Sequence, residues 1–105
     1  MSADFFKIDI HTHIMPEHMP RWAYKFGYSG FIHLDHHKSC CARMMVDDKF
    51  FREIEDNCWA AETRIHECNH LGVDVQVLST IPVLFNYWAQ PKDTLEVARF
   101  LNDHI

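Results

Sequence analysis

The stretch KIDIHTH, residues 7–13, decides how the rest of the chain is interpreted. It lies in a run from about residue 5 to 13 that is rich in aromatic and β-branched residues, which favours a β-strand. Side chains alternate along a strand, so residues two apart share a face at about 6.6 Å. His11 and His13 meet this condition at the carboxyl end of the strand, with Asp9 expected on the same face. The sequence therefore predicts that both imidazoles bind one metal ion, with Asp9 orienting a ligand. The alternative is two polar residues leaving a strand.

A helix and a second strand follow further along the chain. Apolar residues recur at spacings of three and four from about residue 60 to 71, which indicates an amphipathic helix; they are Ala61, Ile65, Cys68 and Leu71. Gly72 stands where a left-handed C-cap would lie. Residues 73–79, VDVQVLS, are typical of a strand. Strand, helix and strand form a βαβ unit, which implies parallel pairing with a right-handed crossover.

Two other segments complete the expected α/β fold. An insertion over about residues 16–56 is expected to be irregular up to residue 35, with a short helix near 21–26. A hairpin is then predicted with its turn at Asp47 and Asp48. A last helix over about 92–105, opened by Pro91, is predicted to bury a stripe made of Leu95, Ala98, Leu101 and Ile105.

Composition excludes several classes of protein. The net charge is −5 and the basic residues are scattered, which argues against a nucleic-acid-binding protein. No signal peptide and no run of about 20 apolar residues is found, so neither secretion nor a membrane partner is expected. The four cysteines include no C-x-x-C pair, so we expect reduced thiols in the cytosol instead of disulfides or a zinc finger.

Several segments carry a resemblance to a known family. KIDIHTHIMP resembles the opening of amidohydrolase-superfamily barrels, whose first strand ends in H-x-H. FGYSGFIHLDHH, FFRE, DNCW, LNDHI and the long segment from RIHECNHLGVD to PKDTLE resemble, within that superfamily, the zinc-dependent decarboxylases that act on 2-amino-3-carboxymuconate 6-semialdehyde in the kynurenine pathway of tryptophan degradation. The resemblance covers nearly the whole chain, as an amino-terminal portion of such an enzyme.

The resemblance implies a (β/α)₈ TIM barrel with a small insertion after strand 1 and one zinc ion per complete subunit. The zinc would activate water and polarise the substrate, whose non-oxidative decarboxylation gives 2-aminomuconate 6-semialdehyde and limits quinolinate formation. His11 and His13 would be the first two zinc ligands, and Arg52 would bind a substrate carboxylate. A homodimer is implied for the full-length enzyme. The alternative for Arg52 is a solvated ion pair beside Glu53 and Glu55.

The length of the chain bears on its own activity. A (β/α)₈ barrel needs about 250 residues, whereas this chain has 105 and stops after the second βα unit. We therefore expect the chain alone to be inactive, because the later ligands and the acid/base residue are absent, and no catalytic residue is assigned. Two alternatives stay open: a non-catalytic product that associates with full-length subunits, and another amidohydrolase-type metal hydrolase. An aromatic loop with Phe85, Tyr87 and Trp88 either lines the substrate pocket or packs onto its own domain.

Overall fold

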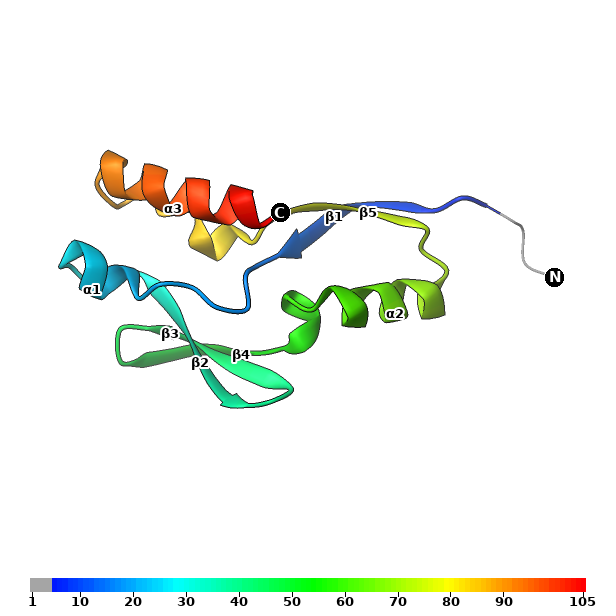
Figure 1. Cartoon of the computed structure of the whole chain (residues 1–105), viewed down its shortest axis with the longest axis horizontal. Coiled ribbons are helices and arrows are strands. Elements are labelled where there is room, and N and C mark those ends of the chain that lie inside the picture. The colour runs from blue at the N-terminus through cyan, green and yellow to red at the C-terminus, as the bar shows by residue number, and fades with distance from the viewer. Residues whose placement is uncertain (1–4) are drawn as a thin grey trace.

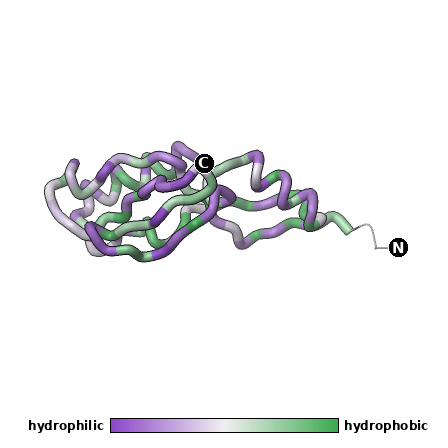
Figure 2. The backbone as a smooth tube through the Cα atoms, turned by 90° about the horizontal axis from the view of Figure 1, so that it is seen from below, coloured by the Kyte–Doolittle hydropathy of each residue, from purple (hydrophilic) through white to green (hydrophobic). Residues whose placement is uncertain are grey.

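The structure, a computed structural model, describes residues 5–105. It is an elongated molecule of 57 × 30 × 18 Å. The described residues form a two-stranded parallel sheet and a three-stranded antiparallel sheet. In Figure 1 the parallel sheet and α2 extend to the right as an arm, and the antiparallel sheet, α1 and α3 form a thicker body on the left. Figure 2 shows the same division from below. The fold is mixed α/β.

The arm is the predicted βαβ unit. β1 (Ile8–Ile14) pairs in parallel with β5 (Val75–Thr80), and α2 (Ala61–Leu71) belongs to the connection between them. Gly72 ends α2 in the left-handed conformation, with φ of 72° and its N–H bonded to the Cys68 carbonyl. This conformation costs glycine no Cβ clash, which is why the pattern predicted the helix end correctly.

The antiparallel sheet occupies the predicted insertion. Its strands are β2 (Ile32–Lys38), β3 (Cys41–Val46) and β4 (Lys49–Glu55), in that order. The β3–β4 hairpin turns at Asp47 and Asp48, as predicted. β2 was expected to be irregular, and that prediction is wrong for this segment. Only Ile32 and Leu34 alternate as apolar residues, and the rest of the strand is polar. Pairing with β3 therefore stabilises a strand that its own sequence pattern does not indicate.

The hydrophobic core lies in the body. α1 (Trp22–Phe26), the antiparallel sheet and α3 (Pro91–His104) each contribute side chains that are almost fully buried. The ring of Trp22 stacks on Phe26 at a centroid distance of 5.8 Å and meets Phe100 of α3 edge-on at 5.4 Å. These contacts join the first helix to the last. No helix of the described residues is both long and apolar enough to cross a membrane.

The buried face of α3 differs from the predicted one. Leu101 is 3% exposed as expected, but Leu95 and Ile105 are 50% and 55% exposed, so the predicted stripe is wrong at these two residues. The buried residues are Asp93, Val97 and Leu101, spaced by four. Asp93 turns inward because its Oδ2 accepts a 2.6 Å hydrogen bond from the Tyr28 hydroxyl. The contact between Asp93 and Tyr28 therefore turns the buried face of α3 away from the one that the apolar pattern predicted.

A disulfide joins the adjacent residues Cys40 and Cys41. The prediction of reduced thiols is therefore wrong for this pair, while Cys58 and Cys68 are free. The two bonded cysteines lie where β2 turns into β3, and Cys41 pairs with Lys38 across the turn. Adjacency and the turn together bring the two sulfurs within bonding distance, which a search for spaced cysteine motifs does not detect.

Candidate metal centre

His11 and His13 lie next to each other near the carboxyl end of β1. Their ring centroids are 5.2 Å apart, with an interplanar angle of 83°. His11 is exposed and His13 is half-buried. Two imidazoles this close can both direct a nitrogen at one divalent cation. The structure thus brings together the two residues that the sequence proposed as metal ligands.

His13 has a hydrogen-bond partner on the neighbouring strand. Its Nδ1 lies 3.0 Å from Oγ of Ser79 on β5. The Ser79 hydroxyl in turn donates to the main-chain carbonyl of Thr12 at 3.1 Å. Sequence reasoning missed Ser79, although the strand register that pairs it with His13 follows from two strands that the sequence did predict.

A β-bulge in β1 decides which side chains share the face of His13. The parallel register shifts between Asp9 and Thr12, so Asp9 pairs with Gln76 and His13 with Ser79. Paired residues of a parallel ladder point to the same side, and side chains alternate along β5. Asp9 is therefore on the opposite face from His13, which corrects the expectation that it orients a ligand. Its carboxylate instead accepts the His11 main-chain N–H at 3.1 Å.

The face of Asp9 and Gln76 is the one that α2 covers. Arg64 of α2 donates to Gln76 Oε1 at 3.1 Å. The opposite face, which carries His13 and Ser79, also carries Val75 and Val77, which are 40% and 50% exposed. The histidine pair therefore lies at the end of an apolar sheet face that no described residue covers.

Within residues 5–105 no group of three or more His, Cys, Asp or Glu side chains has an arrangement that could hold a metal ion. His37, His18 and His36 make separate local contacts. His37 pairs with Glu53 at 2.8 Å, and the rings of His18 and His36 lie 5.1 Å apart. Among the described residues, His11 and His13 are therefore a pair of candidate ligands without a third beside them.

Arg52 lies on β4, in the other sheet. It is exposed, it pairs with Met44 across the ladder, and its guanidinium carbon lies 5.8 Å from the Phe51 ring centroid. Among the described residues its side chain forms no hydrogen bond or ion pair, since Glu53 pairs with His37 instead. The guanidinium is therefore available to an anion, and the structure shows no contact between it and the histidines.

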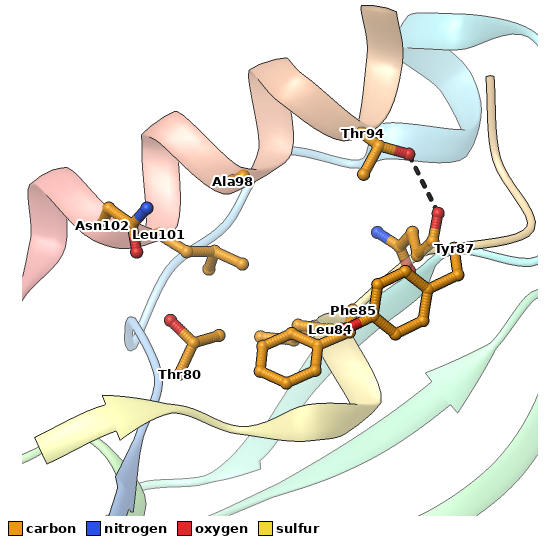
Figure 3. Close-up of a pocket in the computed structure, with 9 residues that line it drawn as sticks. Thr80, Leu84, Phe85, Tyr87, Thr94, Ala98, Leu101 and Asn102 are labelled. Atoms are coloured by element: carbon orange, nitrogen blue, oxygen red, sulfur yellow. Dashed lines mark hydrogen bonds between the residues drawn. The ribbon is translucent and has the colours of Figure 1, made fainter. Parts of the chain in front are cut away.

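The aromatic loop after β5 has two roles. Trp88 packs onto Phe31 at a centroid distance of 4.8 Å and onto Tyr28 at 6.2 Å, the self-packing alternative. Phe85 and Tyr87 line a cavity of about 200 Å³ between the loop and α3, as Figure 3 shows. A hydrogen bond from Thr94 Oγ1 to the Asn86 carbonyl at 2.9 Å closes one end.

This cavity is separate from the histidine pair. Its strand residue, Thr80, pairs with Ile14 and so lies on the opposite face of the sheet from Ser79 and His13. No charged side chain lines it. The cavity therefore offers no His, Cys, Asp or Glu ligand for a metal ion and no cationic partner for a carboxylate.

Comparisons with known proteins identify relatives of the chain. It is 59% identical over 99 residues to 2-amino-3-carboxymuconate-6-semialdehyde decarboxylase of Dictyostelium discoideum, a match of 94% of this chain and 28% of that protein. The Caenorhabditis elegans protein of the same name is 50% identical over 99 residues, covering 94% of this chain and 25% of the relative. The Sus scrofa protein is 44% identical over 50 residues, or 48% of this chain and 36% of the relative.

No protein-family model matches the chain. The chain spans about a quarter of the length of the first two relatives, and both matches cover nearly all of its own residues. Identity of this degree over 99 residues is far more specific than two histidines at the end of a strand. The chain is thus a homologue of the 2-amino-3-carboxymuconate-6-semialdehyde decarboxylases, and it corresponds to one portion of them.

Proposed function

We propose that this chain supplies part of the active site for the zinc-dependent, non-oxidative decarboxylation of 2-amino-3-carboxymuconate 6-semialdehyde to 2-aminomuconate 6-semialdehyde. The observation that carries the proposal is the 59% identity to a decarboxylase of that name, in a chain whose two candidate ligands lie side by side. The setting is tryptophan degradation in the cytosol. The complete enzyme is a homodimer, and each of its subunits folds as a (β/α)₈ barrel.

The donor set fits zinc. Zinc in catalytic sites takes nitrogen and oxygen ligands from three protein side chains and leaves one position open. His11 and His13 would provide two of these ligands. Regions of the enzyme that correspond to the rest of the relatives' length would provide the others. When bound, zinc supplies Lewis-acid chemistry that polarises a substrate oxygen. The chain's own residues hold the imidazoles on one strand end, where barrel enzymes place their chemistry.

Arg52 would bind a carboxylate of the substrate. A guanidinium stays charged at any working pH and presents a planar fork that matches a carboxylate. Its side chain is exposed and has no partner among the described residues, so binding an anion breaks no existing ion pair. The loss of one carboxyl group as carbon dioxide requires the substrate to be oriented, and a bidentate contact fixes orientation.

A chimaera tests the proposal. The homologous quarter of the Dictyostelium decarboxylase is replaced by this chain, and disappearance of the muconate semialdehyde is followed by absorbance. We expect the chimaera to retain decarboxylation and to lose it on His11→Ala, His13→Ala or Arg52→Ala. His66→Ala, on the exposed surface of α2, is the matched control. A folded, zinc-loaded chimaera without activity would rule the proposal out.

A second candidate function is association with a homologous subunit. The sheet face that carries His13 exposes apolar residues, with Ile8 at 53% and Val77 at 50% exposure. Exposed apolar patches of this kind commonly mark interaction sites. Size-exclusion chromatography of the chain mixed with the Dictyostelium enzyme tests this candidate, since a shift of the chain to the enzyme's elution volume is expected.

A further inference from the structure

The hydrogen bonds of Ser79 select one tautomer of the neutral His13 ring. A main-chain carbonyl can only accept, so the single hydroxyl proton of Ser79 goes to the Thr12 oxygen at 3.1 Å. The Ser79 oxygen is then left as an acceptor for the His13 Nδ1, 3.0 Å away. This contact needs a proton on Nδ1. In the neutral ring the other nitrogen, Nε2, then carries the lone pair.

We propose that Ser79 is a positioning residue that holds His13 as the Nδ1–H tautomer and thereby presents Nε2 to the metal ion. This inference rests on the proposed metal site. Metal-binding histidines usually donate their second N–H to a carboxylate, a carbonyl or water, which fixes both ring orientation and tautomer. Here a serine hydroxyl, itself fixed by the Thr12 carbonyl, fills that role.

The β-bulge makes this contact possible. If the register Asp9 to Gln76 ran on without a shift, Thr12 would pair with Ser79 and His13 with Thr80. The observed pairs are Thr12 with Leu78 and His13 with Ser79, because β1 has one extra residue. Bulges of this kind re-aim side chains near functional sites. The extra residue in β1 therefore places His13, which follows it, opposite Ser79.

His11 lacks such support. Among the hydrogen bonds of residues 5–105, its ring takes part in none, and only its main-chain N–H is bonded, to Asp9. The two ligands should therefore differ: His13 is held in one tautomer by the chain itself, and His11 is free to exchange between two. This difference gives the experiment an internal reference.

Nitrogen-15 NMR of the metal-free chain tests the inference through the two-bond couplings between the carbon-bound ring protons and the ring nitrogens. We expect Nδ1–H for His13 in the wild type, a shift towards Nε2–H in Ser79→Ala, and restoration in Ser79→Thr, which keeps a hydroxyl. His11 should be unchanged in all three. Ser39→Ala, in the β2–β3 turn, is the control for a remote serine.

Cobalt(II) titration of the chimaera carrying the same substitutions supplies the second readout, because the Dictyostelium enzyme provides the remaining ligands there. Loss of an outer-shell partner typically costs about 10–100-fold in metal affinity, so Ser79→Ala should weaken binding by that factor and Ser79→Thr should not. Nε2–H in the wild-type His13, or a tautomer that Ser79→Ala leaves unchanged, would overturn the inference. Correct tautomers with no cobalt binding in any variant would instead refute the proposed metal site alone.

A second, independent inference concerns Cys40 and Cys41. Cys40 is exposed and Cys41 half-buried at the turn between β2 and β3. The two other thiols differ from this pair: Cys68 lies half-buried on α2, and burial raises the pKa of the Cys58 thiol, which lowers its reactivity. Because Cys40 is exposed and Cys58 is half-buried, a solvent-borne thiol can reach the sulfur of Cys40 more easily than that of Cys58.

We propose that Cys40 and Cys41 form a reversible dithiol–disulfide site. A small dithiol reduces it: the Cys40–Cys41 bond breaks, each sulfur gains a hydrogen, and the reductant closes into its own cyclic disulfide. A low-molecular-weight disulfide such as oxidised glutathione reverses the step and leaves as two thiols. Because the sulfurs belong to neighbouring residues, the bond re-forms without movement of any distant segment.

Tryptic mapping tests this site directly. Cleavage after Lys38 and Arg43 releases SCCAR, residues 39–43, which contains both cysteines and no other thiol. From chain prepared without reductant and treated with iodoacetamide in denaturant, we expect this peptide without alkyl groups. After dithiothreitol it should carry two, and after exchange into oxidised glutathione it should again carry none.

Cys58 and Cys68 fall in the separate peptides 53–64 and 65–92 and serve as controls in the same digest. Both should be alkylated at every stage. Alkylation of both cysteines of SCCAR before reduction would overturn the inference, and so would a re-oxidised SCCAR that is cross-linked to either control peptide.

Discussion

The arm and the body of this molecule differ in how far their apolar side chains are buried. In the body, Trp22 and Met44 are 2% and 1% exposed. In the arm, α2 buries no residue, and Ile65 on its surface is 61% exposed. The candidate metal centre lies on the arm. The part of the chain that carries the two candidate metal ligands is therefore not the part that buries most of the apolar side chains, so changes in each should have separable effects.

Two leucines on one helix give the largest expected effect. Leu101→Ala removes a side chain that is 3% exposed, and we expect a loss of about 2–5 kcal/mol in the free energy of unfolding. Leu95→Ala removes one that is 50% exposed, and the loss should stay below about 1 kcal/mol. Urea denaturation followed by circular dichroism measures both. Equal losses would support the buried stripe first predicted for α3 and contradict the buried face that the structure shows.

Two glycines of the body give a smaller effect. A Cβ on Gly30, at φ 108°, would lie 2.8 Å from the Trp88 ring, whereas a Cβ on Gly27, at φ 83°, would meet nothing within 4 Å. Both substitutions to alanine strain the backbone, by about 1–2 kcal/mol. Gly30→Ala should cost more, because Trp88 must also leave Phe31. The shift of the thermal midpoint measures the difference, and equal shifts would contradict the packing of the aromatic loop.

The smallest effect concerns pH. Partial burial and the hydrogen bond to Asp93 raise the pKa of the Tyr28 phenol above its ordinary value of about 10. The folded state then keeps a proton that the unfolded state loses. The contribution of Tyr28 to stability is therefore fully present below a pH of about 10 and is lost as the pH rises through the folded pKa. Tyr28→Phe should remove this part of the pH dependence of the unfolding free energy. Tyr87→Phe, at an 88% exposed position, should leave it in place.

The sequence predicted elements whose cause is local. Runs rich in β-branched residues indicated β1 and β5, three-and-four spacing indicated α2, and Gly72 marked its end. What it missed depends on contacts between separate segments of the chain. β2 exists through its ladder with β3, and the buried face of α3 is set by the contact between Tyr28 and Asp93.

The same division holds for the candidate site. The i and i+2 spacing placed His11 and His13 together, and the structure has their rings 5.2 Å apart. The bulge that sends Asp9 to the other face and brings Ser79 to His13 is a property of two paired strands. No pattern within residues 7–13 could reveal it, because a register shift leaves the sequence of either strand ordinary.

Cobalt(II) binding to the chimaera, in which the Dictyostelium enzyme supplies the remaining ligands, is the most direct test of the claim that His11 and His13 together form part of a metal site. Titration followed by visible absorption, with zinc as competitor, should show one cobalt ion bound per chain. Binding should be lost in both His11→Ala and His13→Ala and kept in His66→Ala. Cobalt bound equally well by all these variants, or by none including the wild type, would contradict the account.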